Sequence, residues 1–287
     1  EWAVPDGALT PTSVTFELQY RTGDGDWQRA PYANAAQEVN ADDNWTATWE
    51  NLPRTIYGET VQYQVVERDL DGGWIQTDCT DGTENGIRTI TFYNAPIVPF
   101  TVTKKWVPSD GEHPDVTVAL YRTTEPTEIG SDIAANRVGD TTITLPTEEG
   151  KWEYTFSSLP QYDAAARRYY YYALELDSSG SAVEDNGGLT MDSKEYIATY
   201  DFGGTPSSTT TITNTSAVTL TGTKRWTAAD RPDITLILQR KTEQTEWVTV
   251  TEFAPVWNKS GDTWTFTYPY LPAVDPDGNA YTYRVQE

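Results

Sequence analysis

The sequence WEYTFSSLP, Trp152–Pro160, has two counterparts in the chain: WTATWENLP, Trp45–Pro53, and WTFTYPYLP, Trp264–Pro272. In each copy a Leu-Pro pair stands seven residues after a Trp. Alternating apolar and polar residues favour a strand, and the proline, which lacks a backbone N–H, interrupts its pairing. Self-similarity of this kind is typical of tandem repeats. We therefore interpret the 287-residue chain as one unit repeated three times.

Each copy also begins with a Trp, followed by a strand of alternating apolar residues. These Trp residues are Trp2, Trp106 and Trp226, so the copies are spaced by 104 and then 120 residues. The strands are PTSVTFELQYR, PDVTVALYRT and PDITLILQRK. Units of this size, with short strands, regular turn residues and no convincing helix, predict an all-β chain of tandem immunoglobulin-like β-sandwiches. The short connection APIVPFT (95–101) favours stiff stacking of neighbouring units.

Three polar positions recur at fixed places in this pattern. A Glu ends the motifs YQVVE, YYALE and YRVQE, 15 or 16 residues after the Leu of each Leu-Pro pair. A Lys precedes the second and third starting Trp by two residues, and an Asn lies in the last strand of the first and second copies. A whole unit thus carries a Lys early, a Glu late and an Asn on its final strand. The residues are Lys104, Lys224, Glu67, Glu175, Glu287, Asn94 and Asn214.

The ordered set VTKKW, PDVTVALY, LP, YYALE and ITNTS resembles the B-type repeat of collagen-adhesin-like surface proteins of Gram-positive bacteria, the CnaB family of adhesin stalks and pilins. The resemblance covers nearly the whole chain, three times. It implies an intramolecular isopeptide bond between a Lys and an Asn, formed with the help of a Glu. Carried over to the middle copy, it assigns the bond to Lys104 and Asn214 and the catalytic role to Glu175.

The other two copies hold only part of this set. In the first copy, Glu67 and Asn94 are present, but the Lys position falls one residue before Glu1. The third copy has Lys224 and Glu287 but no final strand. We therefore expect two half-sites whose partners lie outside this chain. The expected domains are 1–97, lacking its Lys strand, 98–217, complete, and 218–287, lacking its Asn strand.

The chemistry implied by the resemblance suits a buried site. Burial favours the neutral amine of a Lys, which can attack an amide carbon, and the protonated carboxyl group of a Glu, which can move protons. Such a reaction occurs once per molecule, so we expect no enzyme activity beyond self-crosslinking. A Lys beside a Trp is more often a solvated edge residue, and Lys105 is the competitor on the opposite face. Alignment on Trp106 favours Lys104.

Composition excludes several classes of function. The formal net charge is −23, which argues against nucleic acid as a partner because phosphate binding needs clustered basic residues. No apolar run is long enough to insert in a membrane. The single Cys79 excludes an internal disulfide framework, and the single His113 disfavours a His-based triad or metal site. We expect no cofactor.

Some acidic loops resemble calcium sites only superficially. DGDW, DLDGG and DPDGN begin at Asp24, Asp69 and Asp275, and none has the Glu that a calcium-binding loop needs at position twelve. We interpret all three as turns and leave weak cation binding open. A carbohydrate-active enzyme would need two carboxylates in a cleft outside the repeat pattern, and the sequence indicates none.

The expected function is a structural stalk segment of a bacterial cell-surface adhesin or pilus-like protein. It would be extracellular, anchored to the cell wall through a region outside this chain, and its partners would be the neighbouring repeats. The alternative is an adhesive module that binds a host glycan or matrix protein directly. The loop TTEPTEIGSDIAANRVGDTT (123–142) is the first place to look for such binding. Trp74 and Trp257, which lack counterparts in the other copies, are candidates for a surface role.

Overall fold

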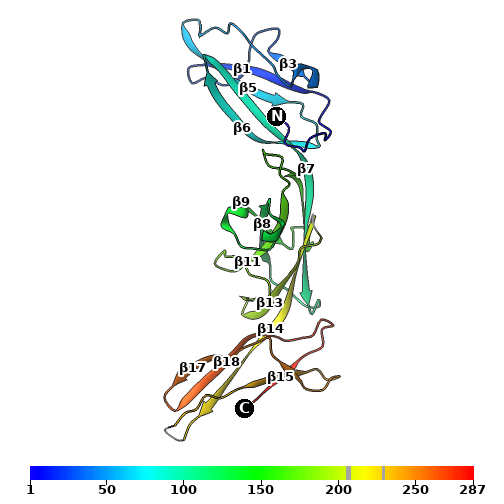
Figure 1. The fold of residues 1–287 in the computed structure, drawn as a ribbon, viewed down its shortest axis with the longest axis vertical. Coiled ribbons are helices and arrows are strands. Elements are labelled where there is room, and N and C mark those ends of the chain that lie inside the picture. Colours follow the sequence, from blue (N-terminus) through cyan, green and yellow to red (C-terminus); the bar gives the residue numbers. More distant parts are fainter. Residues whose placement is uncertain (205–207, 228–229) are drawn as a thin grey trace. The chain divides into compact units, whose positions relative to one another are not determined.

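The computed structural model describes residues 1–204, 208–227 and 230–287 (Figure 1). Two residues of the third Trp motif, Ala228 and Ala229, lie outside the described residues. The chain forms two compact units. Unit 1 comprises Glu1–Pro99 and Phe156–Tyr169, and unit 2 comprises Phe100–Thr155 and Tyr170–Glu287.

Unit 1 is built on two groups of antiparallel strands. The first is a sheet of five short strands, and Glu67 lies on its strand β5. Its members are β2 (Gln28–Arg29), β1 (Val14–Thr22), β5 (Glu59–Arg68), β4 (Thr55–Ile56) and, paired with β1, β3 (Ala36–Val39). In the second group, β6 (Trp74–Glu84) pairs with the first part of β7 (Ile87–Val107). One 3-10 turn, η1 (Ala41–Asp43), follows β3.

The strands of unit 2 belong to three sheets. The largest joins the second part of β7 in parallel to β14 (Thr209–Arg225). Its other strands are the first part of β10 (Glu153–Pro160), β13 (Lys194–Asp201), β12 (Gly187–Met191), β18 (Thr263–Pro272) and β17 (Val256–Ser260). A three-stranded sheet has the order β11 (Tyr170–Leu176), β8 (Val116–Thr123), β9 (Arg137–Leu145). Another has the order β16 (Val248–Val250), β15 (Ile237–Lys241), β19 (Thr282–Gln286).

The prediction of an all-β chain is confirmed. Helical structure in the described residues consists of single 3-10 turns: η1, η2 (Pro126–Glu128) and η3 (Ala134–Asn136). None of the helices in this part of the chain has the length and apolar character needed to cross a membrane.

The segment expected to link the first two copies is itself strand. APIVPFT lies inside β7, so the last strand of the first copy and the first strand of the second are continuous. The same holds for β14, which carries both Asn214 and Lys224.

One strand is buried more completely than its pattern predicts. On β8, Val116, Val118 and Leu120 share a buried face, as alternation requires. Tyr121, from the opposite face, is also buried, at 1% exposure. The loop between β8 and β9 covers this second face: the hydroxyl of Tyr121 donates to Asp132 at 2.9 Å, and Ile129 packs on the same cluster.

Two of the recurring sequence landmarks touch each other. The hydroxyl of Tyr63, the first residue of YQVVE, donates to the carbonyl oxygen of Pro53 at 3.0 Å. In the third copy, Tyr283 donates to the carbonyl oxygen of Pro272 at 2.7 Å. A proline cannot continue the ladder as a donor, but its carbonyl still needs a partner. In these two copies, the hydroxyl of the Tyr that begins the Glu motif therefore supplies a hydrogen bond to the carbonyl oxygen of the Leu-Pro pair.

Candidate functional site

Lys104 and Asn214 lie on neighbouring parallel strands. β7 and β14 pair with Lys104 opposite Ile212 and Trp106 opposite Asn214. Because side chains alternate between the faces of a strand, Lys104 and Asn214 point to the same face, displaced by two residues. Lys105 points to the other face and is exposed, whereas Lys104 is 3% exposed.

Glu175 joins this pair from another sheet. It lies on β11, opposite Val118 of β8, and is fully buried. Its Oε1 accepts a hydrogen bond from Nδ2 of Asn214 at 2.9 Å, and its Oε2 lies 3.2 Å from Nζ of Lys104. The structure thus brings all three residues of the middle copy together, with one carboxyl group touching both others.

Burial sets the electrostatics of the site. Removal from water lowers the pKa of Lys104 from its ordinary value to about 8, although the neighbouring Glu175 opposes the shift. Near neutral pH, a larger share of Lys104 side chains is then a neutral amine than for a solvated Lys. Oδ1 of Asn214 is also buried and has no hydrogen-bond partner. The amine of Lys104 and the amide oxygen of Asn214 are therefore both buried without a hydrogen-bond partner, next to the carboxyl group of Glu175.

Aromatic rings line this site. Nζ of Lys104 lies 4.5 Å from the ring centroid of Trp106. Trp106 in turn meets the edges of Trp152 and Tyr196, at 5.5 and 5.2 Å between centroids. His113 stacks on Trp106 with centroids 4.5 Å apart. The repeated Trp residues thus form the apolar wall of the site, and the single His packs against that wall.

The first copy repeats part of the arrangement in unit 1. Nδ2 of Asn94 donates to Oε1 of Glu67 at 2.8 Å, and burial raises the pKa of Glu67. Trp2 forms a parallel bridge with Asn94, just as Trp106 pairs with Asn214. The alignment of the copies on Trp therefore agrees with the register of the strands.

The surface role expected for Trp74 is not what the structure favours. Trp74 is half-buried and meets the edge of Trp2, with centroids 5.0 Å apart. It pairs with Pro96, two residues after Asn94, as Tyr196 pairs with Ser216, two residues after Asn214. Trp74 does have a counterpart, which sequence comparison missed because it is a Tyr. Trp257 is likewise half-buried and packs against Phe266 at 5.5 Å.

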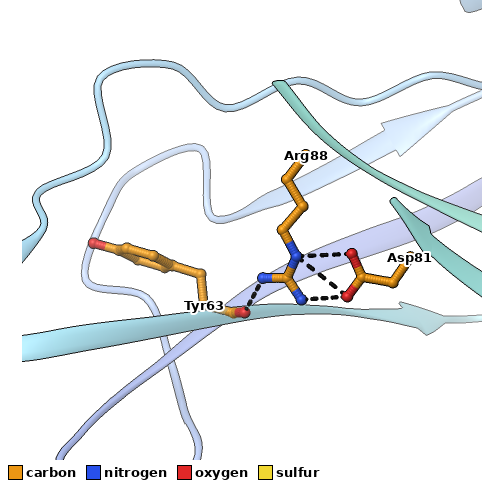
Figure 2. A network of polar contacts seen from close by, with 3 residues as sticks. All are labelled: Tyr63, Asp81 and Arg88. Carbon is orange, nitrogen blue, oxygen red and sulfur yellow. Dashed lines mark hydrogen bonds and ion pairs between the residues drawn. The ribbon is translucent and has the colours of Figure 1, made fainter. Parts of the chain in front are cut away.

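An ion pair that the sequence did not reveal supports the Glu67 strand (Figure 2). Arg88 of β7 binds Asp81 of β6, with Nη2 to Oδ2 at 2.6 Å and Nε to Oδ1 at 2.9 Å. Its Nη1 also donates to the carbonyl oxygen of Tyr63 on β5 at 2.6 Å. Arg88 therefore ties the β6–β7 pair to the strand that carries Glu67. Only the three-dimensional pairing shows this, because Arg88 and Tyr63 are 25 residues apart.

The third copy brings together its two expected residues at a more open site. Nζ of Lys224 lies 2.6 and 2.7 Å from the two carboxylate oxygens of Glu287. The side chains are 26% and 48% exposed, in contrast to the dry site around Lys104. Lys224 also lies 5.0 Å from the ring centroid of Trp226, as Lys104 lies over Trp106.

The acidic loop that begins at Asp275 forms a turn in the structure. Asp275 accepts hydrogen bonds from the backbone N–H groups of Asp277 and Asn279, at 3.0 and 2.7 Å, which is the geometry of a turn. Among the described residues, no group of three or more His, Cys, Asp or Glu side chains is arranged to hold a metal ion. Cys79 is exposed.

Comparison with known proteins gives one family. A family model of the Cna protein B-type domain matches residues 2–91, 100–215 and 220–287. A collagen adhesin of Staphylococcus aureus is 26% identical over 282 residues, which are 96% of this chain and 20% of that protein. The chain therefore spans about a fifth of the length of this curated relative.

The chain is also similar to solved structures, with low TM-scores. A crystal structure of two B repeat units of the collagen binding protein of Staphylococcus aureus is 23% identical, covering 96% of this chain and 63% of that chain, with a TM-score of 0.26. The pilus adhesin SpaC of Lactobacillus rhamnosus GG is 15% identical, covering 91% of this chain and 34% of that chain, with a TM-score of 0.29.

Proposed function

Since the chain belongs to the family of Cna protein B-type domains, we propose that it is a structural stalk segment of a bacterial cell-surface adhesin or pilus-like protein. In this proposal, residues 98–217 form a domain locked by an isopeptide bond between Lys104 and Asn214. The observation that carries it is the buried contact of Glu175 with both of these residues. The segment would act outside the cell, between neighbouring repeats of the same chain.

The proposed reaction is an amide exchange with a balanced outcome. The neutral Nζ of Lys104 attacks Cγ of Asn214, a bond forms between these atoms, and the bond from Cγ to Nδ2 breaks. The carboxyl group of Glu175 takes a proton from Nζ as the new bond forms and passes a proton to Nδ2, so that ammonia leaves. The carboxyl group ends in the state in which it began. The reaction occurs once per molecule and makes the chain its own substrate.

The contacts support two requirements of this step, proximity and a neutral amine. Packing fixes the amine and the amide on one face of adjacent strands, which provides a high effective concentration. Burial increases the share of neutral amine by lowering the pKa of Lys104. Rotation of the Asn214 side chain would exchange Nδ2 and the unpartnered Oδ1 opposite Glu175, so that the carboxyl group could donate to the oxygen.

Two further pairs hold part of the same residue set. Glu67 is hydrogen-bonded to Asn94, and Lys224 is paired with Glu287. The proposal therefore assigns one internal bond to residues 1–287 and domains at 1–97, 98–217 and 218–287.

Intact mass tests the bond directly. We expect the purified chain to be lighter than its sequence by one molecule of ammonia. Lys104→Ala, Asn214→Ala and Glu175→Ala should each restore the full mass. Lys105→Ala is the matched control, because Lys105 is adjacent but exposed on the other face, and it should keep the loss. A wild-type chain at its full sequence mass would refute the proposal.

Direct adhesion to a host glycan or matrix protein is the second candidate function. The loop at 123–142 offers it little support, because its polar groups bond to one another: Thr123 and Asn136 both donate to Glu128, at 2.8 and 3.0 Å. Saturable binding of this chain to a matrix protein or a glycan array, lost when this loop is replaced, would favour adhesion over a purely structural role.

A further inference from the structure

The strand that carries Glu175 has one edge that faces away from its partner strand β8. In its sheet, β11 is an outer strand with β8 on one side. The backbone of Glu175 bonds away from β8: its N–H donates to the hydroxyl of Tyr200 at 3.2 Å, and its carbonyl accepts from the N–H of Val183 at 2.8 Å. A fully buried edge needs such partners, because each unpaired backbone group would destabilise the fold.

Tyr200 reaches Glu175 from the other sheet. It lies on β13, opposite Ile212 of β14. Its hydroxyl accepts from the Glu175 N–H and donates to the carbonyl oxygen of Val183 at 2.8 Å. One hydroxyl thus joins the backbone of Glu175 to that of Val183. Burial raises the pKa of Tyr200, so the phenol keeps the proton that it donates.

A second side-chain hydroxyl, that of Thr210, accepts a hydrogen bond from a backbone N–H on the same edge of β11. Thr210 of β14 is fully buried, and its Oγ1 accepts from the N–H of Ala173 at 3.3 Å. Ala173 precedes Glu175 by two residues, so both N–H groups point to the edge of β11 that faces away from β8. Side-chain hydroxyls of the opposite sheet therefore cap two successive outward N–H groups beside the site.

We propose that Tyr200 is a positioning residue for the isopeptide reaction, which fixes the backbone of Glu175 and thereby holds its carboxyl group against Lys104 and Asn214. The inference rests on the function proposed above. A carboxyl group that must lie 3.2 Å from one partner and 2.9 Å from another tolerates little displacement of the strand that carries it. Thr210 supports the same strand one step further from the carboxyl group.

Unit 1 has no hydroxyl in the position of Tyr200. A hydrogen bond from such a hydroxyl to the Glu strand is therefore not required by every copy of the fold. The residue opposite Phe92, two before Asn94, is Cys79, as Tyr200 is opposite Ile212, two before Asn214. Cys79 is exposed. The Glu67 strand is tied instead by Arg88, through the carbonyl oxygen of Tyr63 (Figure 2). The Tyr200 hydroxyl therefore accompanies the middle copy, in which Lys104, Glu175 and Asn214 are all present.

The rate of ammonia loss tests the proposal. The full chain would be made in a cell-free reaction, and its intact mass followed with time for wild type, Tyr200→Phe, Thr210→Val and the control Tyr121→Phe. Tyr121 is 1% exposed, more buried than Tyr200, and its hydroxyl donates to Asp132 instead of contacting the backbone of Glu175. Loss of one hydrogen bond to the positioned backbone should slow Tyr200→Phe about tenfold. Thr210→Val should be slowed less, and Tyr121→Phe should match wild type.

A second readout separates positioning from general stability. In the Asn214→Ala chain, which keeps Lys104 and Glu175 but cannot close, the Glu175 amide proton should exchange faster when Tyr200→Phe is added, and not when Tyr121→Phe is added. Equal closure rates for Tyr200→Phe and Tyr121→Phe, whether both fast or both slow, would overturn the positioning role. A wild-type chain that never loses ammonia would instead refute the proposed function itself.

Discussion

At the scale of single residues, the site depends on a lysine that is buried where a lysine is ordinarily solvated. Because side chains alternate along β7, Lys104 points into the core and its neighbour Lys105 points to water. The buried amine has one close acid, Glu175, and one close aromatic ring, Trp106. The fold thus controls the protonation of Lys104, because burial lowers the pKa of its amine.

The pH dependence of folding should reveal this control. In the Asn214→Ala chain, burial holds the pKa of Lys104 at about 8 in the folded state, against an ordinary 10.5 when unfolded. Between these values the unfolded state binds more protons, so the free energy of unfolding should rise with pH from about 8 to about 10 and stay flat just below 8. Urea titrations at several pH values measure it. The control Lys104→Met/Asn214→Ala should lack the rise, and an equal rise in both chains would contradict the prediction.

At the scale of strands, the sequence predicted the elements that repeat and missed those that differ between copies. Trp2, Trp106 and Trp226 recur as the same residue, and their register beside Asn94 and Asn214 was predictable. Trp74 and its counterpart Tyr196 differ in type, so their equivalence appears only in the strand pairing.

The site shows the same division. Lys104, Glu175 and Asn214 were predictable because repetition singles them out. Tyr200 and Thr210 were not, because they act on the backbone of β11 through an edge that no local pattern indicates. Arg88 was hidden for the same reason, since its partner Tyr63 lies on a strand with which β7 does not pair.

A close contact between β12 and β18 gives a prediction at this scale. A Cβ added to Gly188 would lie 2.3 Å from the ring of Tyr270, which is held at a positive φ of 51°. Gly188→Ala should therefore lower the free energy of unfolding of unit 2 by about 1 to 3 kcal/mol, through overpacking. Chemical denaturation measures the change. Gly82→Ala is the control, since its Cβ would meet nothing within 4 Å, and equal effects of the two would argue against the contact.

At the scale of the whole molecule, each long strand serves two sets of residues. β7 carries Asn94 and, ten residues later, Lys104, and β14 carries Asn214 and Lys224 with the same separation. The final strand of one copy is therefore the first strand of the next. In the proposed function, a bond between Lys104 and Asn214 would link these two long strands side by side.

That link should stabilise the chain by restricting its unfolded state. A closure from Lys104 to Asn214 encloses roughly a hundred residues, for which the chain-entropy argument gives about 4 to 5 kcal/mol. Lys104→Ala should lower the free energy of unfolding of unit 2 by an amount of this order, measured by denaturant titration. Lys105→Ala should leave it nearly unchanged. A Lys104→Ala chain as stable as wild type would count against the closure.

The continuity of β7 and β14 also bears on how the chain would survive proteolysis. If Lys104 is bonded to Asn214, every peptide bond between them lies inside a covalent ring, and one cut there leaves the two ends of the chain joined. A protease site inserted in the exposed turn at 148–150 should give nicked wild type that runs as one band on a denaturing gel. The same insertion with Lys104→Ala should give two fragments. A stalk built this way would keep its cargo attached after damage that severs an ordinary chain.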